Sequence, residues 1–347
     1  MTSLSPDLEA VVQRVGHLWE VLRGARVLIT GGTGFVGRWL LGSLVVANRE
    51  LSLGVRVVVL ARRPEVLARV APELAAEPSL TLLKGDVRAL RPDFGPITHV
   101  IHGATAASAS FNLADPAGML DVIENGARSL LGLCEALAVQ RLLLLSSGAV
   151  YRQPCATGVP LTEDAPLGPD APEETSAYHA GKRLAERLAW EAVAEFGLRL
   201  TVARPFALVG PYLPLDSHFA IGNFIRDALE GGPVVVKGDG TAVRSYLYAG
   251  DMAAWLWAML LDEGAVGRTY NVGGERALSI AEVARVVSDI GLGDAEVEIR
   301  GGVGSSGGGE WYVPCTARAQ RDLGVMEWTR LEEAVRHTIA WNRGGGA

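Results

Sequence analysis

The sequence is poor in the residues and runs that mark several protein classes. It has only three cysteines in 347 residues, Cys134, Cys155 and Cys315, and their spacing fits neither a metal site nor a disulfide framework. Such a sparse, odd number is typical of a reducing compartment, so we expect a cytoplasmic protein without a bound metal. No uninterrupted apolar run reaches the length of a membrane span, and residues 1–14 are too polar for a signal peptide.

Basic residues are also in short supply. Lys and Arg number 32 against 39 Asp and Glu, which gives a net charge of −7, and no basic block stands out. Non-specific nucleic-acid binding needs the opposite balance, so we expect neither a nucleic-acid nor a membrane partner. Apolar residues are plentiful at 49%, with 20% charged residues. This composition and length predict one large α/β unit with a substantial core and a smaller lobe.

Three glycines stand between a predicted strand and a predicted helix near the N-terminus. Residues 27–29 are a short apolar run typical of a buried parallel strand, and apolar residues from Trp39 onward recur at helical spacing. Between them, Gly31 would permit a tight turn, Gly34 would let a cofactor approach, and Gly37 would let the helix pack close to the strand. Backbone N–H groups at such a helix start bind a pyrophosphate. We therefore predict a dinucleotide-binding βαβ unit.

The residues after the second predicted strand, 55–60, bear on the choice of cofactor. An acidic side chain there would bind the 2′-hydroxyl of NAD, whereas this chain has Arg62 and Arg63. Guanidinium groups bind a 2′-phosphate through charge-assisted hydrogen bonds, which favours NADP; the alternative is two surface arginines that open a helix. Asp86, after the third predicted strand at 80–83, either accepts from an adenine amino group or caps a turn.

Small residues follow the fourth predicted strand, 99–102. Gly103 and Ala104 would let a cofactor pass close to the backbone. His102, the last residue of the strand, is a candidate base. Because a histidine that ends a buried strand is more often a satisfied structural group, we interpret it as structural.

The fifth predicted strand, 141–145, follows a predicted helix at about 113–139 and contains four consecutive leucines. That pattern is typical of burial on both faces. Ser147 therefore lies at the carboxyl end of a parallel strand, where open α/β sheets bind ligands. The Pro- and Gly-rich residues 154–172 form a connection long enough to be a functional loop.

A tyrosine and a lysine share one face of the next predicted helix. Tyr178 and Lys182 are four residues apart, and Ser176 precedes them as a helix cap. A tyrosine ionises near pH ~10, and a neighbouring ammonium favours the phenolate. We therefore expect Lys182 to lower the pKa of Tyr178 and make it an acid/base group. A tyrosine and a lysine at this spacing are by themselves common on solvated helix faces. They indicate a catalytic site here because a serine follows the fifth strand.

These motifs resemble those of the extended short-chain dehydrogenase/reductases, in particular the nucleotide-sugar epimerases, dehydratases and reductases. The resemblance spans about residues 25–342. The motifs that carry it are 30–37, 85–86, 146–151, 178 with 182, 203–206 with 209–211, 237–240 with 244, and 248–251. It implies a doubly wound parallel sheet (Rossmann) with a smaller, discontinuous C-terminal substrate lobe. It also implies a homodimer through the helices after strands four and five.

The resemblance implies a role for each matching residue. Ser147 would hold the reacting sugar oxygen, Tyr178 would act as general acid or base, and Lys182 would bind the nicotinamide ribose. Arg244 would clamp the substrate diphosphate, and Arg318 would add a basic contact. Further candidates for substrate contact are Asn223 and His218. The implied cofactor-binding residues are Gly31, Thr33, Gly34, Phe35, Val36, Gly37, Arg62, Arg63, Asp86, Val87, Gly103, Ala104, Tyr178, Lys182 and Pro205.

Three segments bear on the reaction and the substrate contacts that the resemblance implies. The family's 4,6-dehydratases carry an Asp-Glu pair directly after the catalytic hydroxyl, where this chain has Gly148 and Ala149, so we expect no dehydration by that route. The strand-six exit of the family usually carries an asparagine that contacts the diphosphate, where this chain has Ala207. The glycine-rich segment 301–309 is either a mobile substrate loop or a linker, and we interpret it as a linker.

The predicted domains follow from the same patterns. We expect an amphipathic N-terminal helix over 1–24, a dinucleotide domain over 25–205 with about 238–262, and a substrate lobe over 206–237 and 263–347. Predicted helices in the C-terminal half are 219–229, 253–261, 280–290 and 331–341, and 234–236 is a predicted strand. Trp255 and Trp257 are predicted core residues.

The predicted reaction is hydride transfer between nicotinamide C4 and a carbinol or ketone carbon of a nucleotide-diphosphate sugar. An epimerase, which oxidises the sugar and returns the hydride to its other face, ranks slightly ahead of an NADPH-dependent keto-sugar reductase. The arginines at 62 and 63 favour NADP, whereas the usual activity of the family favours the epimerase. A dehydratase is less favoured. A non-catalytic dinucleotide-binding sensor is the alternative from another class.

Overall fold

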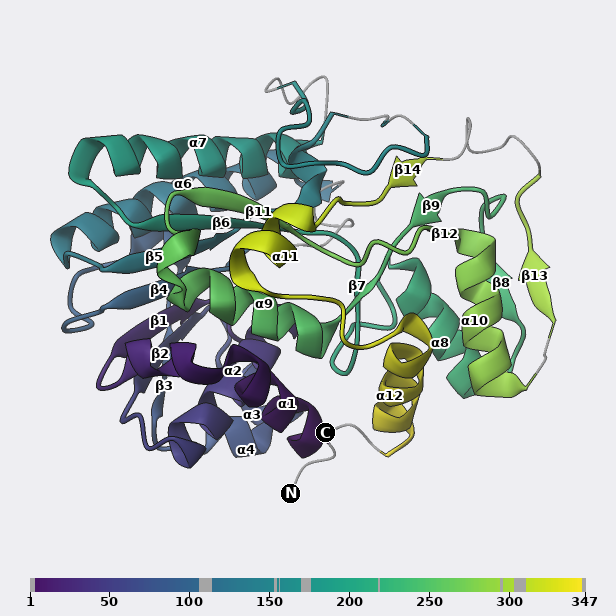
Figure 1. Ribbon diagram of the computed structural model, residues 1–347, viewed down its shortest axis with the longest axis horizontal. Helices are drawn as coiled ribbons and strands as arrows, with labels where there is room; N and C mark the ends of the chain where they lie inside the picture. Colours follow the sequence, from purple (N-terminus) through teal and green to yellow (C-terminus); the bar gives the residue numbers. More distant parts are fainter. Residues whose placement is uncertain are drawn as a thin grey trace.

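A parallel sheet of seven strands forms the centre of the protein (Figure 1). The computed structural model describes residues 4–105, 114–152, 155, 157–169, 176–217, 219–293, 296–302 and 310–344. The sheet runs in the order β11-β6-β5-β4-β1-β2-β3. Its strands are β1 (Arg26–Thr30), β2 (Arg56–Ala61), β3 (Leu80–Lys84), β4 (His99–His102), β5 (Arg141–Leu145), β6 (Leu200–Pro205) and β11 (Arg268–Val272). This is the doubly wound architecture that the sequence predicts.

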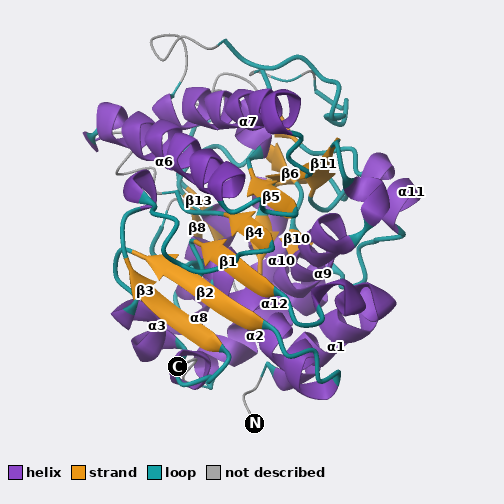
Figure 2. Cartoon of the chain, turned by 90° about the vertical axis from the view of Figure 1, so that its left-hand side faces the viewer, coloured by secondary structure: helices purple, strands orange, loops and turns teal. Residues whose placement is uncertain are grey.

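Helices cover both faces of this sheet because parallel strands need crossover connections (Figure 2). On one face lie α6 (Pro116–Ala136) and α7 (Ala177–Phe196); on the other lie α2 (Phe35–Glu50) and α9 (Ala249–Leu261). Side chains alternate along each strand. Leu142 and Leu144 therefore join the core under α6 and α7, whereas Leu143 and Leu145 join the core under α2 and α9. Short helices α3 (Glu65–Val70), α4 (Pro72–Ala75) and η2 (Val87–Ala89) flank β2 and β3.

The N-terminal segment is helical, as predicted, but changes its winding. It forms α1 (Ser5–Val15) and a 3₁₀ helix, η1 (Gly16–Leu22), and it packs on α2 and α9. Arg14 donates to the buried Asp251 carboxylate at 2.6 Å, and its guanidinium lies 4.7 Å from the Trp328 ring. Asp7 pairs with His337 at 3.3 Å. The segment therefore contacts the large sheet's helices and the C-terminal part of the chain at once.

The described part of the smaller lobe includes three helices and three short sheets. The helices are α8 (Ala220–Glu230), α10 (Ile280–Leu292) and α12 (Leu331–Arg343). The sheets are β7 (Leu208–Val209) with β10 (Leu247–Tyr248), β9 (Val243–Arg244) between β12 (Leu278–Ser279) and β14 (Trp311–Tyr312), and β8 (Val234–Val236) with β13 (Val297–Ile299). Ser279 and Glu282 form a capping box that starts α10.

Two details of the domain prediction differ from the structure. Residues 268–272, predicted within the smaller lobe, form β11 and pair with β6 at the edge of the large sheet. The helix predicted at 253–261 begins earlier, at Ala249. Both helix tryptophans, Trp255 and Trp257, are core residues as predicted. None of the helices in the described ranges has the length and hydropathy to cross a membrane, and no group of metal-ligating side chains gathers there.

Candidate active site

The glycine turn between β1 and α2 is packed too closely for side chains. Gly31 has a φ of +79°, and a Cβ on it would lie 2.7 Å from the Gly103 carbonyl carbon. A Cβ on Gly37 would lie 2.7 Å from the Gly32 carbonyl carbon. Gly34 precedes α2 in an extended conformation and leaves the first N–H groups of that helix without intrahelical partners. The turn thus has the geometry of a pyrophosphate site.

A cavity of about 1060 Å³ extends from this turn along the carboxyl ends of the parallel strands. Every residue that the sequence predicts for cofactor binding lines it: Gly31, Thr33, Gly34, Phe35, Val36, Gly37, Arg62, Arg63, Asp86, Val87, Gly103, Ala104, Tyr178, Lys182 and Pro205. Ser147 and Arg244 line it too. The Ser146 hydroxyl, also in the lining, is buried without a hydrogen-bond partner in the described structure. An orphaned polar group and a glycine cradle fit a bound dinucleotide.

At one end of the cavity, the arginines after β2 keep their charges unpaired. Neither Arg62 nor Arg63 makes an ion pair with any described residue. Asp86 caps η2 by accepting from the Arg88 N–H at 2.9 Å, and its carboxylate accepts from the Arg88 guanidinium at 2.6 and 3.0 Å. These hydrogen bonds lower the pKa of Asp86 to about 2. Of the two roles predicted for Asp86, the structure displays the turn cap.

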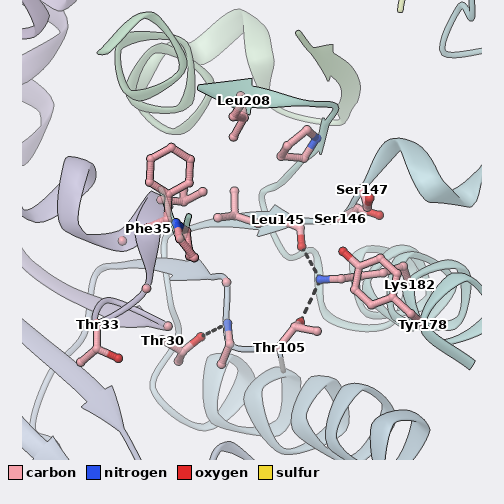
Figure 3. A pocket seen from close by; sticks show the side chains of 18 of the residues that line it. Thr30, Thr33, Phe35, Thr105, Leu145, Ser146, Ser147, Tyr178, Lys182 and Leu208 are labelled. Atoms are coloured by element: carbon pink, nitrogen blue, oxygen red, sulfur yellow. Dashed lines mark hydrogen bonds between the residues drawn. The ribbon is translucent and has the colours of Figure 1, made fainter. Parts of the chain in front are cut away.

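His102 is a structural residue, as interpreted from the sequence. Its Nδ1 lies 2.8 Å from the Thr30 hydroxyl, which also accepts from the Ala104 N–H at 3.2 Å (Figure 3). Burial and the nearby Lys182 ammonium lower the pKa of His102 to about 3. The imidazole is therefore neutral at ordinary pH and serves to join the ends of β1 and β4.

Ser147, Tyr178 and Lys182 come together where β5 ends (Figure 3). The Ser147 hydroxyl accepts from the Ala149 N–H at 3.1 Å and starts a short 3₁₀ turn, η3 (Gly148–Val150). Ser176 caps α7, as predicted, by accepting from the His179 N–H at 3.3 Å. The cap starts the helix one residue before Tyr178, so the tyrosine and Lys182 face the end of β5 together.

The electrostatics of this group differ from the sequence expectation. Burial raises the pKa of Tyr178, and the hydrogen bond with Ser147 only partly offsets this. The Lys182 ammonium donates to the Leu145 carbonyl oxygen at 2.8 Å and to the Thr105 hydroxyl at 3.0 Å, and it lies 5.8 Å from the centre of the Tyr178 ring. Burial lowers the pKa of Lys182 to about 8. In this arrangement desolvation outweighs the attraction between ammonium and phenolate.

Arg244 and Tyr312 are among the side chains that the smaller lobe contributes to the same cavity. Arg244 on β9 donates to the Glu310 carboxylate at 2.5 Å. Tyr312, its partner in the β9–β14 register, lies with its ring centre 5.5 Å from the Arg244 guanidinium. The sequence prediction missed Tyr312, because no motif marks it and its position depends on the pairing of two strands far apart in the chain.

Two predicted substrate contacts lie away from the cavity. Arg318 donates to the Asp164 carboxylate at 2.7 Å and to the Thr269 carbonyl oxygen at 3.3 Å, and it is not among the described residues that line the cavity. Asn223 on α8 accepts from Arg226 at 3.2 Å and does not line it either. The cavity lining does not support these two contacts, and both stay predictions. His218 lies outside the described residues, as does most of the segment 301–309.

Two residues of the family motifs form a buried network behind the site. The Arg204 guanidinium donates to both carboxylate oxygens of Glu186, at 2.9 and 2.6 Å, and to the Tyr151 hydroxyl at 3.0 Å. Tyr151 in turn donates to Asn271 at 2.6 Å. Because Arg204 and Glu186 are both buried, each satisfies the other's charge. The network holds β6, α7 and β11 together.

Comparison with known proteins places the chain in a family. Residues 27–273 match the NAD dependent epimerase/dehydratase family. The chain belongs to that family, which is part of the extended short-chain dehydrogenase/reductases, and it is an enzyme of that group. UDP-glucuronic acid decarboxylase 6 of Arabidopsis thaliana is 29% identical over 279 residues, which are 79% of this chain and 76% of the relative.

Solved structures share the fold over almost the whole chain. UDP-glucose 4-epimerase of Thermotoga maritima, solved with UDP-glucose, superposes with a TM-score of 0.78 at 21% identity and covers 92% of this chain and 99% of its own. MoeE5, in complex with UDP-glucose and NAD, superposes with a TM-score of 0.75 at 26% identity, covering 93% of this chain and 100% of its own. The Rossmann sheet and the smaller lobe are therefore common to these proteins.

Proposed function

We propose that this protein is an NAD(P)-dependent epimerase of a nucleotide-diphosphate sugar in which Tyr178 acts as the acid/base group. The observation that carries the proposal is the meeting of Ser147, Tyr178 and Lys182 in the cavity that begins at the glycine turn. A bound nicotinamide supplies the hydride acceptor and donor. The other end of the cavity has room for a sugar nucleotide between the large sheet and the smaller lobe.

Each residue of the group has a separate task in this reaction. Tyr178 takes the proton of the sugar hydroxyl and returns it, and Ser147 holds the same oxygen through a hydrogen bond. Lys182, whose pKa burial lowers to about 8, still carries its proton at neutral pH and binds the nicotinamide ribose. Its charge also favours the Tyr178 phenolate against the cost of burial.

The residues near Ser147 favour epimerisation over dehydration. Expulsion of water from the oxidised sugar needs an acid and a base besides Tyr178. The positions after Ser147 are Gly148 and Ala149, and Asp86 is the sole carboxylate among the described residues that line the cavity. Asp86 is held by Arg88 at the opposite end. Return of the hydride to the sugar is the step that this set of side chains supports.

A nucleotide sugar as substrate is supported by the relatives and by Arg244. The relatives are named for UDP-glucuronic acid and UDP-glucose, and one solved structure holds UDP-glucose. Arg244 lines the cavity from the smaller lobe. Its planar guanidinium would bind the diphosphate bidentately in place of its present partner, Glu310.

One observation favours a second function, an NADPH-dependent keto-sugar reductase. Arg62 and Arg63 line the cavity where the ribose of a dinucleotide lies in this fold. Their guanidinium groups, which make no ion pair within the described ranges, suit a 2′-phosphate. A preference for NADP links the enzyme to a cellular reductant, whereas an epimerase recycles its own cofactor.

Mass spectrometry of nucleotides released by denaturation separates the two functions. Freshly purified protein that releases stoichiometric NAD(H) or NADP(H) supports the epimerase, whereas empty protein that binds NADPH reversibly supports the reductase. UDP-glucose and UDP-glucuronic acid are then tested as substrates. Release of CO₂ from the latter would replace the epimerase proposal with a decarboxylase. Full activity of Tyr178→Phe would contradict any enzymatic role of this site.

We also propose a homodimer formed through α6 and α7, which lie side by side on one face of the large sheet (Figure 2). In this arrangement the two helices of each protomer form a four-helix interface. Light scattering at micromolar concentration tests the proposal, and a monomer mass would contradict it.

A further inference from the structure

The hydroxyl of Ser146 is buried in the site without a hydrogen-bond partner. Ser146 follows Leu145 at the end of β5 (Figure 3) and is 6% exposed. Its Oγ makes no hydrogen bond with any described residue. Buried polar groups are nearly always paired, because an unpaired hydroxyl has lost its hydrogen bonds to water without a replacement. This hydroxyl lines the cavity, so a bound ligand can supply the partner.

The backbone on both sides fixes the position of Ser146. Its N–H donates to the carbonyl oxygen of Ala203 on β6 at 2.8 Å. The carbonyl oxygen of the preceding residue, Leu145, accepts from the Lys182 ammonium at 2.8 Å. Neither hydrogen bond uses the serine side chain. The hydroxyl is therefore held beside the proposed catalytic serine, Ser147, with one proton and two lone pairs that no described residue uses.

The order of the strands indicates which part of a dinucleotide reaches Ser146. The cavity is lined by Arg62 after β2, by the glycine turn after β1, by Gly103 after β4 and by Ser146 after β5, and these strands are neighbours in the order β2-β1-β4-β5. In this fold the ribose of the adenosine lies at the end of β2 and the pyrophosphate at the glycine turn. The other half of the dinucleotide, which carries the nicotinamide, therefore extends over the ends of β4 and β5.

We propose that Ser146 is a cofactor-binding residue whose hydroxyl pairs with the carboxamide of the nicotinamide. The proposal rests on the proposed function, which places a nicotinamide beside Tyr178. The carboxamide is the only hydrogen-bonding group on the nicotinamide ring, and it has both an N–H donor and a carbonyl acceptor. A serine hydroxyl can pair with either. Because hydride transfer leaves the carboxamide unchanged, this hydrogen bond serves the oxidised and the reduced cofactor alike.

Isothermal titration calorimetry of Ser146→Ala with NAD⁺ and with ADP-ribose tests the proposal. ADP-ribose has both riboses and the pyrophosphate of NAD⁺ but lacks the nicotinamide. Loss of one hydrogen bond should weaken NAD⁺ binding about five- to tenfold and leave the affinity for ADP-ribose within about twofold of wild type. The ratio of the two affinities is the decisive quantity, since a general disturbance of the site weakens both ligands. NADP⁺ and ADP-ribose 2′-phosphate give the same comparison.

Ser245→Ala is the matched control. The Ser245 hydroxyl is also buried without a hydrogen-bond partner among the described residues, but Ser245 is not part of the described cavity lining. The two substitutions thus remove the same group from the same kind of environment, and only one of them faces the proposed cofactor. The control should leave the affinities for NAD⁺ and ADP-ribose unchanged.

Thermal unfolding with and without NAD⁺ separates cofactor binding from a structural role. Because removal of an unpaired hydroxyl breaks no hydrogen bond within the protein, Ser146→Ala should not lower the melting temperature of the protein without NAD⁺. A ligand that binds only the folded state raises the melting temperature according to its affinity. At one fixed concentration of NAD⁺, the rise should therefore be smaller in Ser146→Ala than in wild type.

Three results would overturn the proposal. They are an unchanged affinity of Ser146→Ala for NAD⁺, equal losses for NAD⁺ and ADP-ribose, and a lower melting temperature of the variant without NAD⁺, which would reveal a partner inside the protein. Failure of the proposed function looks different. Wild-type protein that binds NAD⁺ but exchanges no hydride with any nucleotide sugar would contradict the epimerase, and the calorimetry would still report the hydrogen bond of Ser146.

Discussion

Replacing Arg62 by Asp should shift the ratio of the NADP⁺ and NAD⁺ affinities toward NAD⁺. The Arg62 side chain is exposed, lines the cavity and makes no ion pair with a described residue. A hydrogen bond to a charged group contributes about 1.5–3 kcal/mol, which is roughly ten- to a hundredfold in affinity. Because water screens an exposed site, we expect the loss of NADP⁺ affinity to lie near the lower figure, about tenfold. The new carboxylate also repels a 2′-phosphate.

The affinity for NAD⁺ should change in the opposite direction. A carboxylate after β2 can accept from the 2′-hydroxyl of the ribose, so binding of NAD⁺ should be retained or improve by a few-fold. Isothermal titration calorimetry with both cofactors measures the two affinities directly. The informative quantity is their ratio, which cancels any general effect of the substitution on the fold.

Arg69→Asp is the matched control for charge. Arg69 is exposed on α3, outside the cavity, and its replacement changes the net charge by the same amount. If Arg62 acts by contact, the control should leave the ratio of affinities within about twofold. Equal losses for NAD⁺ and NADP⁺ in Arg62→Asp would refute the reasoning. An equal change in Arg69→Asp would assign the effect to long-range electrostatics.

Three further variants test other parts of the structure. Asp251→Ala leaves Arg14 of α1 and two backbone N–H groups without their buried partner. Denaturant titration should therefore show that the free energy of unfolding falls by about 3–5 kcal/mol. A fall of less than about 1 kcal/mol would contradict the assigned hydrogen bonds. The hydrogen bond to Asp7 is the chief cause of the raised pKa of His337. The Asp7–His337 pair therefore stabilises the fold fully below about pH 6.5, and this stabilisation is lost as the pH rises through the raised pKa of His337. Thermal unfolding should therefore show a steeper loss of stability from about pH 6 to 8 in wild type than in His337→Gln, and parallel curves would exclude this pair. Gly148→Ala would overlap the Tyr312 hydroxyl, so turnover should fall about tenfold or more with NADP⁺ affinity unchanged; undiminished turnover would count against that geometry.

The parts of the site that the sequence predicts correctly are those encoded by neighbouring residues. The bounds of β4 and β5 agree with the prediction because short β-branched and leucine runs flanked by small or polar residues leave little freedom. The serine cap before Tyr178 is likewise a local interaction. Since parallel strands present their carboxyl ends at one edge, the residues that follow them line one cavity.

The expectations that the structure does not support depend on contacts between distant segments. Arg318 matched a family position by its spacing, but α11 (Ala317–Leu323) presents it to Asp164 rather than to the cavity. The lowered pKa expected for Tyr178 requires the attraction of the Lys182 ammonium for the phenolate to outweigh the effect of burial. The fold instead directs Lys182 to the Leu145 carbonyl and withdraws the phenol from water.

The sequence by itself determined the dinucleotide fold and the places of Ser147, Tyr178 and Lys182 at the ends of its elements. These follow from hydrophobic period, backbone freedom at glycine and helical spacing, all of which act over a few residues. Only the tertiary structure decided that the Tyr312 hydroxyl lies against Gly148, because β14 must first pair with β9. It also decided the direction in which the pKa values of Tyr178 and Lys182 shift, since desolvation is a property of the whole packed molecule and of no single segment.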